Sequence, residues 1–324
     1  MAGVLALFAC CDGNGFGILR GMKTSGPPTT SSEDRSSRPG EPIGLVGVGL
    51  VGRALAERLL GARFDVVGFD RDPSCLDSLR ALGGHAAASL TDLVASCRRI
   101  FLSLPNGDVV QAVLDQVKGR LRSGQVFIDT TTGGPRSAVE SGRMLEPLGV
   151  AYLDAAICGN SEELRRGEVL VVAGGPAAAF EECQDVFATF ARRSWRVGDW
   201  GAGSKMKLTT NLVLGLNRAV LAEGLAFAGA LGLDPELALT VLRESSSYSR
   251  VMDLKGRKML ERDFTPQARL SQHLKDVRLM LEAGAGAGVE LPLSERHRQL
   301  LEQAEAAGLG ALDNSAIIEV LRRA

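Results

Sequence analysis

Three closely spaced glycines have the spacing of a phosphate-binding turn. Gly47, Gly49 and Gly52 follow an apolar run and open an amphipathic segment, which is the pattern of a strand, a tight turn and a helix. Such a turn lets the backbone approach a pyrophosphate, and the N-terminus of the helix supplies N–H groups and a positive dipole. The spacing therefore predicts a dinucleotide-binding turn, to which Leu50 and Val51 at the helix start also belong.

An acidic residue follows the glycines at the distance that such a site requires. Asp70 ends a second apolar run, about 20 residues further on, where a carboxylate can accept hydrogen bonds from the ribose hydroxyls of adenosine. This favours NAD. Arg71 could instead pair with the 2′-phosphate of NADP, although Asp70 would repel the same phosphate. We therefore expect NAD as the cofactor, with NADP as the alternative.

A second group of residues could move a proton. Gly201 and Gly203 mark the start of a long helical segment, with Lys207 in its first turns and Asn211 one turn further on. Hydride transfer between a nicotinamide and a carbinol carbon needs a group that moves the hydroxyl proton. The positive end of a helix dipole disfavours an ammonium, and side chains four residues apart share a helix face. Lys207 is thus the candidate general acid/base, and Asn211 can form a hydrogen bond with the same substrate oxygen.

The elements that position these residues change in character along the chain. Up to residue 200, amphipathic helices alternate with apolar strand-like runs at residues 43–48, 64–69, 99–104, 125–129, 150–154 and 169–173. After Gly201 the strand-like runs end, and long segments rich in Ala, Leu and Glu follow. The expected fold class is an α/β Rossmann fold, doubly wound with a mostly parallel sheet, followed by an all-α C-terminal domain.

The domain organisation follows from these changes. Residues 42–200 are expected to form the NAD(P)-binding domain, and residues 201–324 a helical domain for substrate binding and dimerisation. Residues 1–41 are expected to be a disordered leader, because the stretch 24–41 is rich in Ser, Thr, Pro and Gly and cannot bury enough apolar surface. The apolar stretch from Val4 to Cys11 is too short to span a bilayer, so no membrane anchor is expected.

The composition is that of an ordinary globular protein and limits the partners. Of the 324 residues, 45% are hydrophobic and 23% charged, and the formal net charge of −1 argues against nucleic acid as a partner. The six cysteines include no CxxC pair, which favours a reducing, cytoplasmic compartment. The three histidines share no spacing typical of a metal site or a catalytic triad, so no metal is expected.

Further motifs join the glycine turn and extend the pattern from Ile43 to Leu321. They are Leu104-Pro105, Asp129-Thr-Thr131-Thr132, Gly201-x-Gly203-x-x-x-Lys207-x-x-x-Asn211 and Leu274-Lys275-Asp276. In these motifs the chain resembles the β-hydroxyacid dehydrogenase family, which includes 3-hydroxyisobutyrate dehydrogenase and tartronate semialdehyde reductase. The resemblance implies that Lys207 is the catalytic lysine. It also implies a cofactor contact at the nicotinamide side for Leu104, Pro105, Thr132 and Lys275.

One element departs from the family pattern. The family's substrate loop, DAPVSGGxxGAxxGxL, appears here between Asp154 and Val169, with Cys158 in place of serine and with Asn160 and Glu163 where the family has small residues. A thiol is a poorer hydrogen-bond donor than a hydroxyl, so the identity of the substrate stays open. The resemblance still implies a substrate site built from Thr131, Cys158, Gly159, Asn160, Lys207 and Asn211.

The expected activity is hydride transfer between the nicotinamide and a small 3-hydroxy acid or its semialdehyde. One alternative is an imine reductase of the same architecture, which usually lacks the lysine; another is a dinucleotide-binding protein without catalysis. The segment from Leu212 to Leu231 carries more apolar surface than a small helical bundle can bury, so a homodimer or homotetramer is expected. The remaining expected partner is a small-molecule substrate, with no membrane and no nucleic acid.

Overall fold

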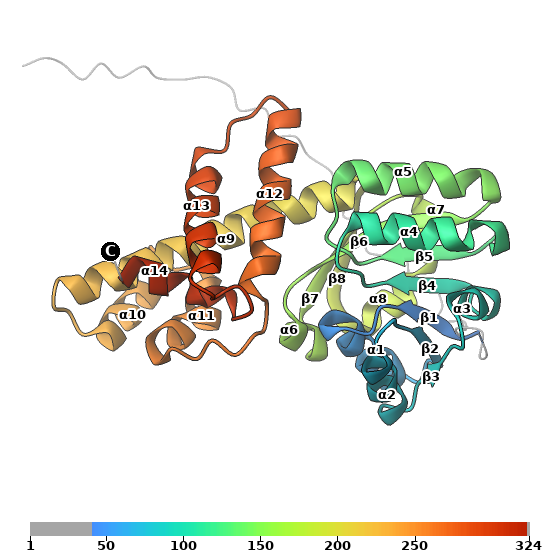
Figure 1. The fold of residues 1–324 in the computed structure, drawn as a ribbon, viewed down its shortest axis with the longest axis horizontal. Helices are drawn as coiled ribbons and strands as arrows, with labels where there is room; N and C mark the ends of the chain where they lie inside the picture. Colours follow the sequence, from blue (N-terminus) through green and yellow to red (C-terminus); the bar gives the residue numbers. More distant parts are fainter. Residues whose placement is uncertain (1–40, 323–324) are drawn as a thin grey trace, which may run out of the picture. The chain divides into compact units, whose positions relative to one another are not determined.

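One eight-stranded sheet forms the centre of the N-terminal region (Figure 1). The structure is a computed structural model that describes residues 41–322, so the predicted leader, apart from Glu41, lies outside the described residues. The strands lie in the order β3-β2-β1-β4-β5-β6-β7-β8. Their bounds are β1 Ile43–Val46, β2 Val66–Phe69, β3 His85–Ala86, β4 Arg99–Leu102, β5 Val126–Asp129, β6 Ala151–Cys158, β7 Val169–Gly174 and β8 Ala191–Gly198.

The strand order places a switch point between β1 and β4. Ile43 of β1 is in register with Val66 of β2 on one side and with Arg99 of β4 on the other, and both pairings are parallel. Among the named strands, β6 and β7 form the one antiparallel pair. In sheets of this kind, ligands bind beyond the carboxyl ends of the strands at the switch point. The predicted doubly wound, mostly parallel Rossmann sheet, followed by an all-helical region, is confirmed.

Helices cover both faces of the sheet because the strands are apolar on both faces. In β1, Ile43 and Leu45 belong to the core formed with α1, α2, α6, α7 and α8, whereas Val46 belongs to the core formed with α3, α4 and α5. This alternation is the two-residue period of a strand. The helices are α1 Leu50–Gly61, α2 Pro73–Ala81, α3 Leu90–Ser96, α4 Gly107–Val117, α5 Pro135–Leu145, α6 Ser161–Arg165, α7 Ala177–Glu182 and α8 Gln184–Phe190, with short 3₁₀ turns η1 Lys118–Arg120 and η2 Glu146–Leu148.

Three strands differ from the sequence prediction. β8 was not predicted, because its residues are mostly polar and it lies exposed at the edge of the sheet, where an apolar pattern is not required. The two-residue strand β3 at the other edge was also missed. β6 continues past the predicted end at Asp154 to Cys158, so Cys158 lies at a strand end and not within a loop.

The C-terminal region is helical and is organised around the long helix α9. α9 contacts β6, β7 and β8 of the sheet and also α10 to α14 (Figure 1). Its inner face packs into a core that includes Leu208, Leu221, Met259, Leu274 and Leu301. The helices are α9 Ala202–Ala230, α10 Pro235–Glu244, α11 Arg250–Glu261, α12 Leu270–Gly286, α13 Pro292–Ala306 and α14 Ile318–Arg322, with the 3₁₀ turn η3 Asn314–Ile317.

Helix α9 has an apolar outer face as well as a buried inner face. It is the one helix within residues 41–322 that is long and apolar enough to cross a membrane by length and composition, and 28% of its most apolar 18-residue window is buried. Val213, Val220 and Phe227, spaced seven residues apart, are all largely exposed. The inner face carries Lys207, Asn211 and the helical core, so α9 is already part of the folded protein on that side.

Candidate active site

The glycine turn lies at the carboxyl end of β1, and its glycines have different roles. Gly47 has a φ of 91°, and a Cβ there would lie 2.2 Å from the carbonyl oxygen of Ser103. A Cβ at Gly52 would lie 2.0 Å from the carbonyl oxygen of Gly47. The packing of the chain therefore requires both glycines. A Cβ at Gly49 would meet no atom within 4 Å, so the backbone there faces open space.

The N-terminus of α1 fits a pyrophosphate group. Gly49 is its N-cap, no side chain caps the first N–H groups, and the first turn contains no acidic residue. Free N–H groups at a helix N-terminus bind phosphate oxygens. Leu50 and Val51 are exposed at this helix start, on the open side of the turn. The residues present are thus suited to hold a dinucleotide at the switch point of the sheet.

Asp70 is held against the glycine turn. One carboxylate oxygen accepts a hydrogen bond of 2.6 Å from the N–H of Val48, and the other accepts one of 2.9 Å from the N–H of Asp72. Each oxygen retains a second lone pair that can accept a hydrogen bond from a ribose hydroxyl. Arg71 is exposed beside it. The structure therefore brings Asp70 to the expected place, and its ribose contact stays a prediction.

The residues expected at the nicotinamide come together from three elements. The N–H of Leu104, after β4, donates a hydrogen bond of 3.1 Å to the hydroxyl oxygen of Thr131, after β5. Lys275 of α12 donates one of 2.7 Å to the carbonyl oxygen of Thr132 and one of 3.3 Å to that of Pro105. Lys275 thus joins the helical region to both loops. The hydroxyl of Thr131 accepts from Leu104, and its own hydrogen is within reach of the carboxylate of Asp129.

A buried pair beneath Thr131 was not recognised from the sequence. Asp129 accepts a hydrogen bond of 2.9 Å from the N–H of Thr131 and one of 2.6 Å from the hydroxyl of Tyr152. Burial raises the pKa of Asp129 to about 6, although both hydrogen bonds oppose the rise. Burial and the neighbouring Asp129 also raise the pKa of Tyr152. The pair fixes the backbone that presents Thr131.

Lys207 lies buried where α9 begins on the sheet. Its side-chain amine donates a hydrogen bond of 2.7 Å to the carbonyl oxygen of Ile157 in β6, and the residue is 8% exposed. The start of α9 is fixed by a hydrogen bond of 2.8 Å from the N–H of Ser204 to the carboxylate of Asp154. A Cβ at Gly203 would lie 2.0 Å from the carbonyl oxygen of Asp154, so only glycine allows this approach.

Asn211 faces the same side of α9 and contacts α12. Its side-chain N–H donates a hydrogen bond of 3.1 Å to one oxygen of Asp276, and the other oxygen of Asp276 lies 3.2 Å from the amine of Lys275. Burial raises the pKa of Asp276, whereas Lys275 and Lys207 oppose the rise. Asp276 therefore links the predicted nicotinamide-side residue Lys275 to the predicted substrate residue Asn211.

The thiol of Cys158 is engaged by α9. Its sulfur lies 3.5 Å from the hydroxyl oxygen of Thr210, and the Thr210 hydroxyl donates its only hydrogen to the carbonyl oxygen of Lys207. The thiol must therefore be the donor between Cys158 and Thr210. This hydrogen bond joins Cys158 to Thr210, which lies one helical turn after Lys207. It leaves the thiol without a hydrogen for a substrate oxygen.

The residues that replace the family's small residues form a helix cap. The side chain of Asn160 accepts hydrogen bonds from the N–H groups of Glu162 and Glu163, and Glu163 accepts one of 3.0 Å from the N–H of Asn160. This is a capping box at α6. Glu163 also pairs with Arg250 of α11 at 3.1 Å. The carboxylate of Glu163 is thus bound by groups of the chain itself. Gly159 remains exposed next to Cys158.

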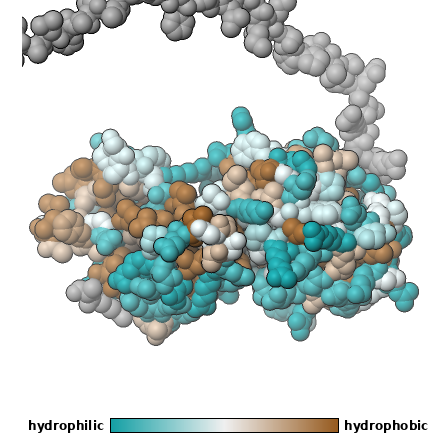
Figure 2. Space-filling model, turned by 90° about the horizontal axis from the view of Figure 1, so that it is seen from above, coloured by the Kyte–Doolittle hydropathy of each residue, from teal (hydrophilic) through white to brown (hydrophobic). Residues whose placement is uncertain are grey.

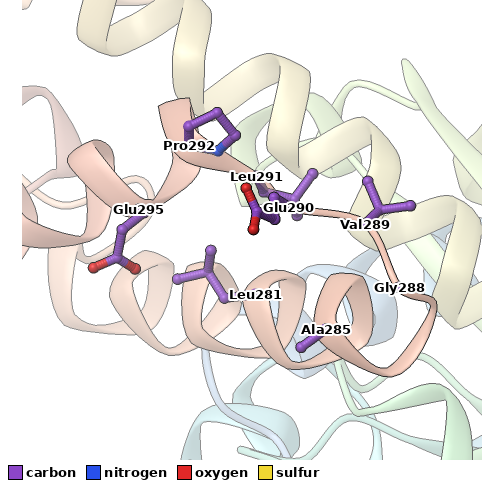
Figure 3. Close-up of a pocket in the computed structure, with 8 residues that line it drawn as sticks. All are labelled: Leu281, Ala285, Gly288, Val289, Glu290, Leu291, Pro292 and Glu295. Atoms are coloured by element: carbon purple, nitrogen blue, oxygen red, sulfur yellow. The ribbon is translucent and has the colours of Figure 1, made fainter.

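A cavity in the helical region lies apart from this set of residues. It has a volume of about 540 Å³ and is formed by the end of α12, the following loop and the start of α13 (Figure 3). Its lining is largely apolar with two glutamates, which offers nothing to a dinucleotide phosphate, and none of the predicted site residues lines it. Within residues 41–322, no group of three or more His, Cys, Asp and Glu side chains could hold a metal ion.

The fold and the clustered residues define an NAD(P)-binding Rossmann oxidoreductase with a helical second region. Residues 42–200 match the NAD-binding domain of 6-phosphogluconate dehydrogenase, and residues 201–321 match the NAD-binding domain of NADP-dependent 3-hydroxyisobutyrate dehydrogenase. The chain belongs to the β-hydroxyacid dehydrogenase family.

Named relatives agree with this assignment. The chain is 33% identical to a 2-(hydroxymethyl)glutarate dehydrogenase of Eubacterium barkeri, over 86% of this chain and 94% of the relative. A solved structure of 3-hydroxyisobutyrate dehydrogenase from Mycobacterium tuberculosis with L-serine superimposes with a TM-score of 0.80 at 26% identity, over 87% and 99% of the two chains. An imine reductase from Pseudomonas sp. reaches a TM-score of 0.61 at 19% identity, over 87% of this chain and 100% of that chain, and shares the fold alone. The comparisons favour the dehydrogenase interpretation over the imine reductase alternative.

Proposed function

We propose that the protein interconverts a small 3-hydroxy acid and its semialdehyde with NAD as the preferred cofactor, and that Lys207 is the general acid/base. The observation that carries this proposal is the buried amine of Lys207 beside β6, on the same helix face as Asn211. A non-catalytic dinucleotide-binding protein would have no use for a buried amine whose partner is one carbonyl oxygen. The bound nicotinamide supplies the hydride chemistry.

Each nearby side chain has a defined part in this proposal. When the hydroxyl is oxidised, the neutral amine of Lys207 accepts its proton; when the carbonyl is reduced, the ammonium returns the proton. Asn211 gives one N–H to Asp276 and keeps the other for the substrate oxygen. The hydroxyl of Thr131 can turn from Asp129 to donate its hydrogen to the substrate carboxylate.

The substrate class is supported by a relative and qualified by the structure. The name of the Eubacterium barkeri enzyme describes a hydroxymethyl group beside a carboxylate, which is the substrate chemistry that we propose here. The thiol of Cys158 already donates to Thr210, so Thr131 and the exposed backbone at Gly159 are the donors left for a carboxylate.

A screen of substrates tests this function. NADH and NADPH oxidation would be measured with small semialdehydes and with cyclic and acyclic imines, and NAD reduction with the corresponding 3-hydroxy acids. We expect turnover with the semialdehydes and hydroxy acids. Turnover of imines alone would overturn the proposed substrate class, and no turnover with intact nucleotide binding would favour a non-catalytic protein.

We also propose that a second copy of the chain covers the apolar outer faces of α9 and α10, giving a homodimer or a homotetramer made of two such dimers. Val220 and Phe227 of α9 are 66% and 64% exposed, and Leu233, Leu237 and Val241 lie four residues apart on and before α10. Figure 2 shows apolar side chains gathered over the helical part of the protein. Light scattering should give at least a dimer at micromolar concentration, and Val220→Asp with Leu237→Asp should give a monomer.

A further inference from the structure

The carboxylate of Glu163 lies directly beside the backbone of the predicted substrate loop. One of its oxygens, Oε2, accepts a hydrogen bond of 3.0 Å from the N–H of Asn160. A Cβ at Gly159 would lie 3.3 Å from the same oxygen. The side chain of Glu163 is 10% exposed, so little water screens its charge. A negative charge is therefore held next to the exposed backbone of Gly159.

This negative charge opposes the binding of an acid at Gly159. In the proposed function, the carboxylate of the substrate binds at the backbone of Gly159. The N–H of Asn160 is not available to it, because Glu163 already accepts that hydrogen. Two carboxylates at neighbouring positions repel each other, whereas an uncharged molecule would not be repelled. The loop can bind an acid well only if a cation neutralises Glu163.

Arg250 supplies this cation from the helical region. One terminal nitrogen of its guanidinium donates a hydrogen bond of 3.1 Å to Oε1, the second carboxylate oxygen of Glu163. The nearby Arg165 is used elsewhere, since it pairs with Glu57 and Glu162. Within residues 41–322, Arg250 is therefore the one ion-pair partner of Glu163.

The charge of Arg250 is not taken up by the acidic residue in the first turn of its own helix. The carboxylate of Asp253 accepts hydrogen bonds of 2.8 and 2.6 Å from the guanidinium of Arg243 and one of 2.6 Å from the hydroxyl of Tyr248. Arg250 is the first residue of α11, where the positive end of the helix dipole adds to its charge. This end of α11 therefore presents positive charge to Glu163.

The two charges belong to different regions of the chain. Glu163 lies in α6, which follows β6 of the sheet, and Arg250 lies 87 residues further on in the helical region. Glu163 also stands where the family pattern has a small residue, which would bring no charge to the loop. The loop thus carries an added negative charge, and the helical region carries the positive charge that offsets it.

We propose that Arg250 is a specificity-determining residue, which neutralises Glu163 and thereby lets the loop at Gly159 bind the acid group of the substrate. The proposal rests on the proposed function, because that function places the substrate carboxylate at Gly159. Two consequences separate it from an ordinary surface ion pair. The charge of Arg250 favours acids over uncharged molecules of the same shape, and this effect requires the carboxylate of Glu163.

The experiment compares two ligands that differ in charge and needs no turnover. Isobutyrate and isobutyramide have the same shape, and their binding to the full-length protein saturated with NADH would be measured by NMR titration. Arg250→Met should weaken the binding of isobutyrate about three- to tenfold and change that of isobutyramide less than about twofold. The effect should shrink in about 0.5 M NaCl. Arg166→Met is the matched control, because Arg166 is 52% exposed and pairs with Glu168 at the same 3.1 Å, and Arg250 is 50% exposed.

A second substitution tests the link to Glu163. Glu163→Gln keeps an acceptor for the N–H of Asn160 and removes the charge, so Arg250→Met should no longer weaken isobutyrate binding in this background. If the methionine variant lacks a native near-UV spectrum, Arg250→Gln takes its place. Unchanged isobutyrate binding in the folded variant, an equal loss for isobutyramide, or a loss that persists with Glu163→Gln overturns the proposal. The expected binding pattern in a protein without turnover contradicts the proposed function alone.

Discussion

The amine of Lys207 donates a hydrogen bond of 2.7 Å to the carbonyl oxygen of Ile157. Within the described part of the chain, no carboxylate lies within ion-pair distance of this amine. A carbonyl oxygen accepts from both an amine and an ammonium, so the partner holds Lys207 in place without fixing its charge. This is the behaviour that a proton carrier needs, because the group must gain and lose a proton in each turnover.

Replacement of Lys207 should therefore act on catalysis and not on cofactor binding. Lys207→Ala is expected to lower kcat by about 10² to 10⁴, the usual contribution of a general acid/base. Fluorescence titration should give an NADH affinity close to that of the wild type. The matched control is Lys205→Ala, since Lys205 is exposed on the same helix. Near-normal turnover in the Lys207 variant would remove the proposed acid/base.

The preference for NAD should depend on the carboxylate of Asp70. NADH should bind at least about tenfold more tightly than NADPH, because a 2′-phosphate would approach a negative charge. Asp70→Asn keeps an acceptor for the N–H of Val48 and removes the charge, so the ratio of the two affinities should fall. Nucleotide fluorescence measures both. Tighter NADPH binding to the wild type would show that Arg71 dominates.

Substitution of Cys158 tests the altered substrate loop. Cys158→Ser restores a hydroxyl, which is a stronger donor than a thiol, but its hydrogen should go to Thr210 as that of the thiol does, so KM for a 3-hydroxy acid should change by less than about threefold. Steady-state kinetics with saturating NAD would measure the change. Cys75→Ser, a partly exposed free cysteine in α2, is the control. A KM that falls by about tenfold in Cys158→Ser and not in the control would show that residue 158 donates to the carboxylate after all.

The buried pair of Asp129 and Tyr152 predicts a pH dependence of stability. Because the pKa of Asp129 is raised from 3.8 to about 6, the folded state holds a proton that the unfolded state releases. This carboxyl should therefore lower the free energy of unfolding by about 3 kcal/mol as the pH rises from about 4 to about 6, with little further change above that range.

Asp129→Asn isolates this contribution. The amide can keep the hydrogen bond from the N–H of Thr131 and donate to the oxygen of Tyr152. Urea unfolding at several pH values should show the variant gaining stability relative to the wild type between pH 4 and 6. A difference that does not vary with pH would indicate that the pKa of Asp129 is the same in the folded and unfolded states.

The sequence predicted the elements and motifs that depend on local signals. The glycine turn, the alternation of strands and helices and the helical region after Gly201 all have residue patterns of their own, and the fold class is confirmed. The edge strand β8 has no such signal, because its polar residues face solvent. A strand of this kind is defined by its neighbour in the sheet.

The partnerships within the site could not be predicted in the same way. Asp129 and Tyr152 are 23 residues apart, and Asn211 and Asp276 are 65 apart, so only the folded chain brings them together. Asp276 and Asn211 were both visible as parts of motifs, but the hydrogen bond between them was not.

Strand β6 meets α9 at two points, through the carboxylate of Asp154 and the carbonyl oxygen of Ile157. Side chains alternate between the faces of a strand, so adding or deleting one residue between these two positions would turn every following side chain to the opposite face. Either change would break the match between these two positions of β6 and their partners on α9, the N–H of Ser204 and the amine of Lys207. We therefore expect the protein to tolerate insertions and deletions in the loops around β6 but not between Asp154 and Ile157, because this part of the strand sets the distance between its two contacts with α9.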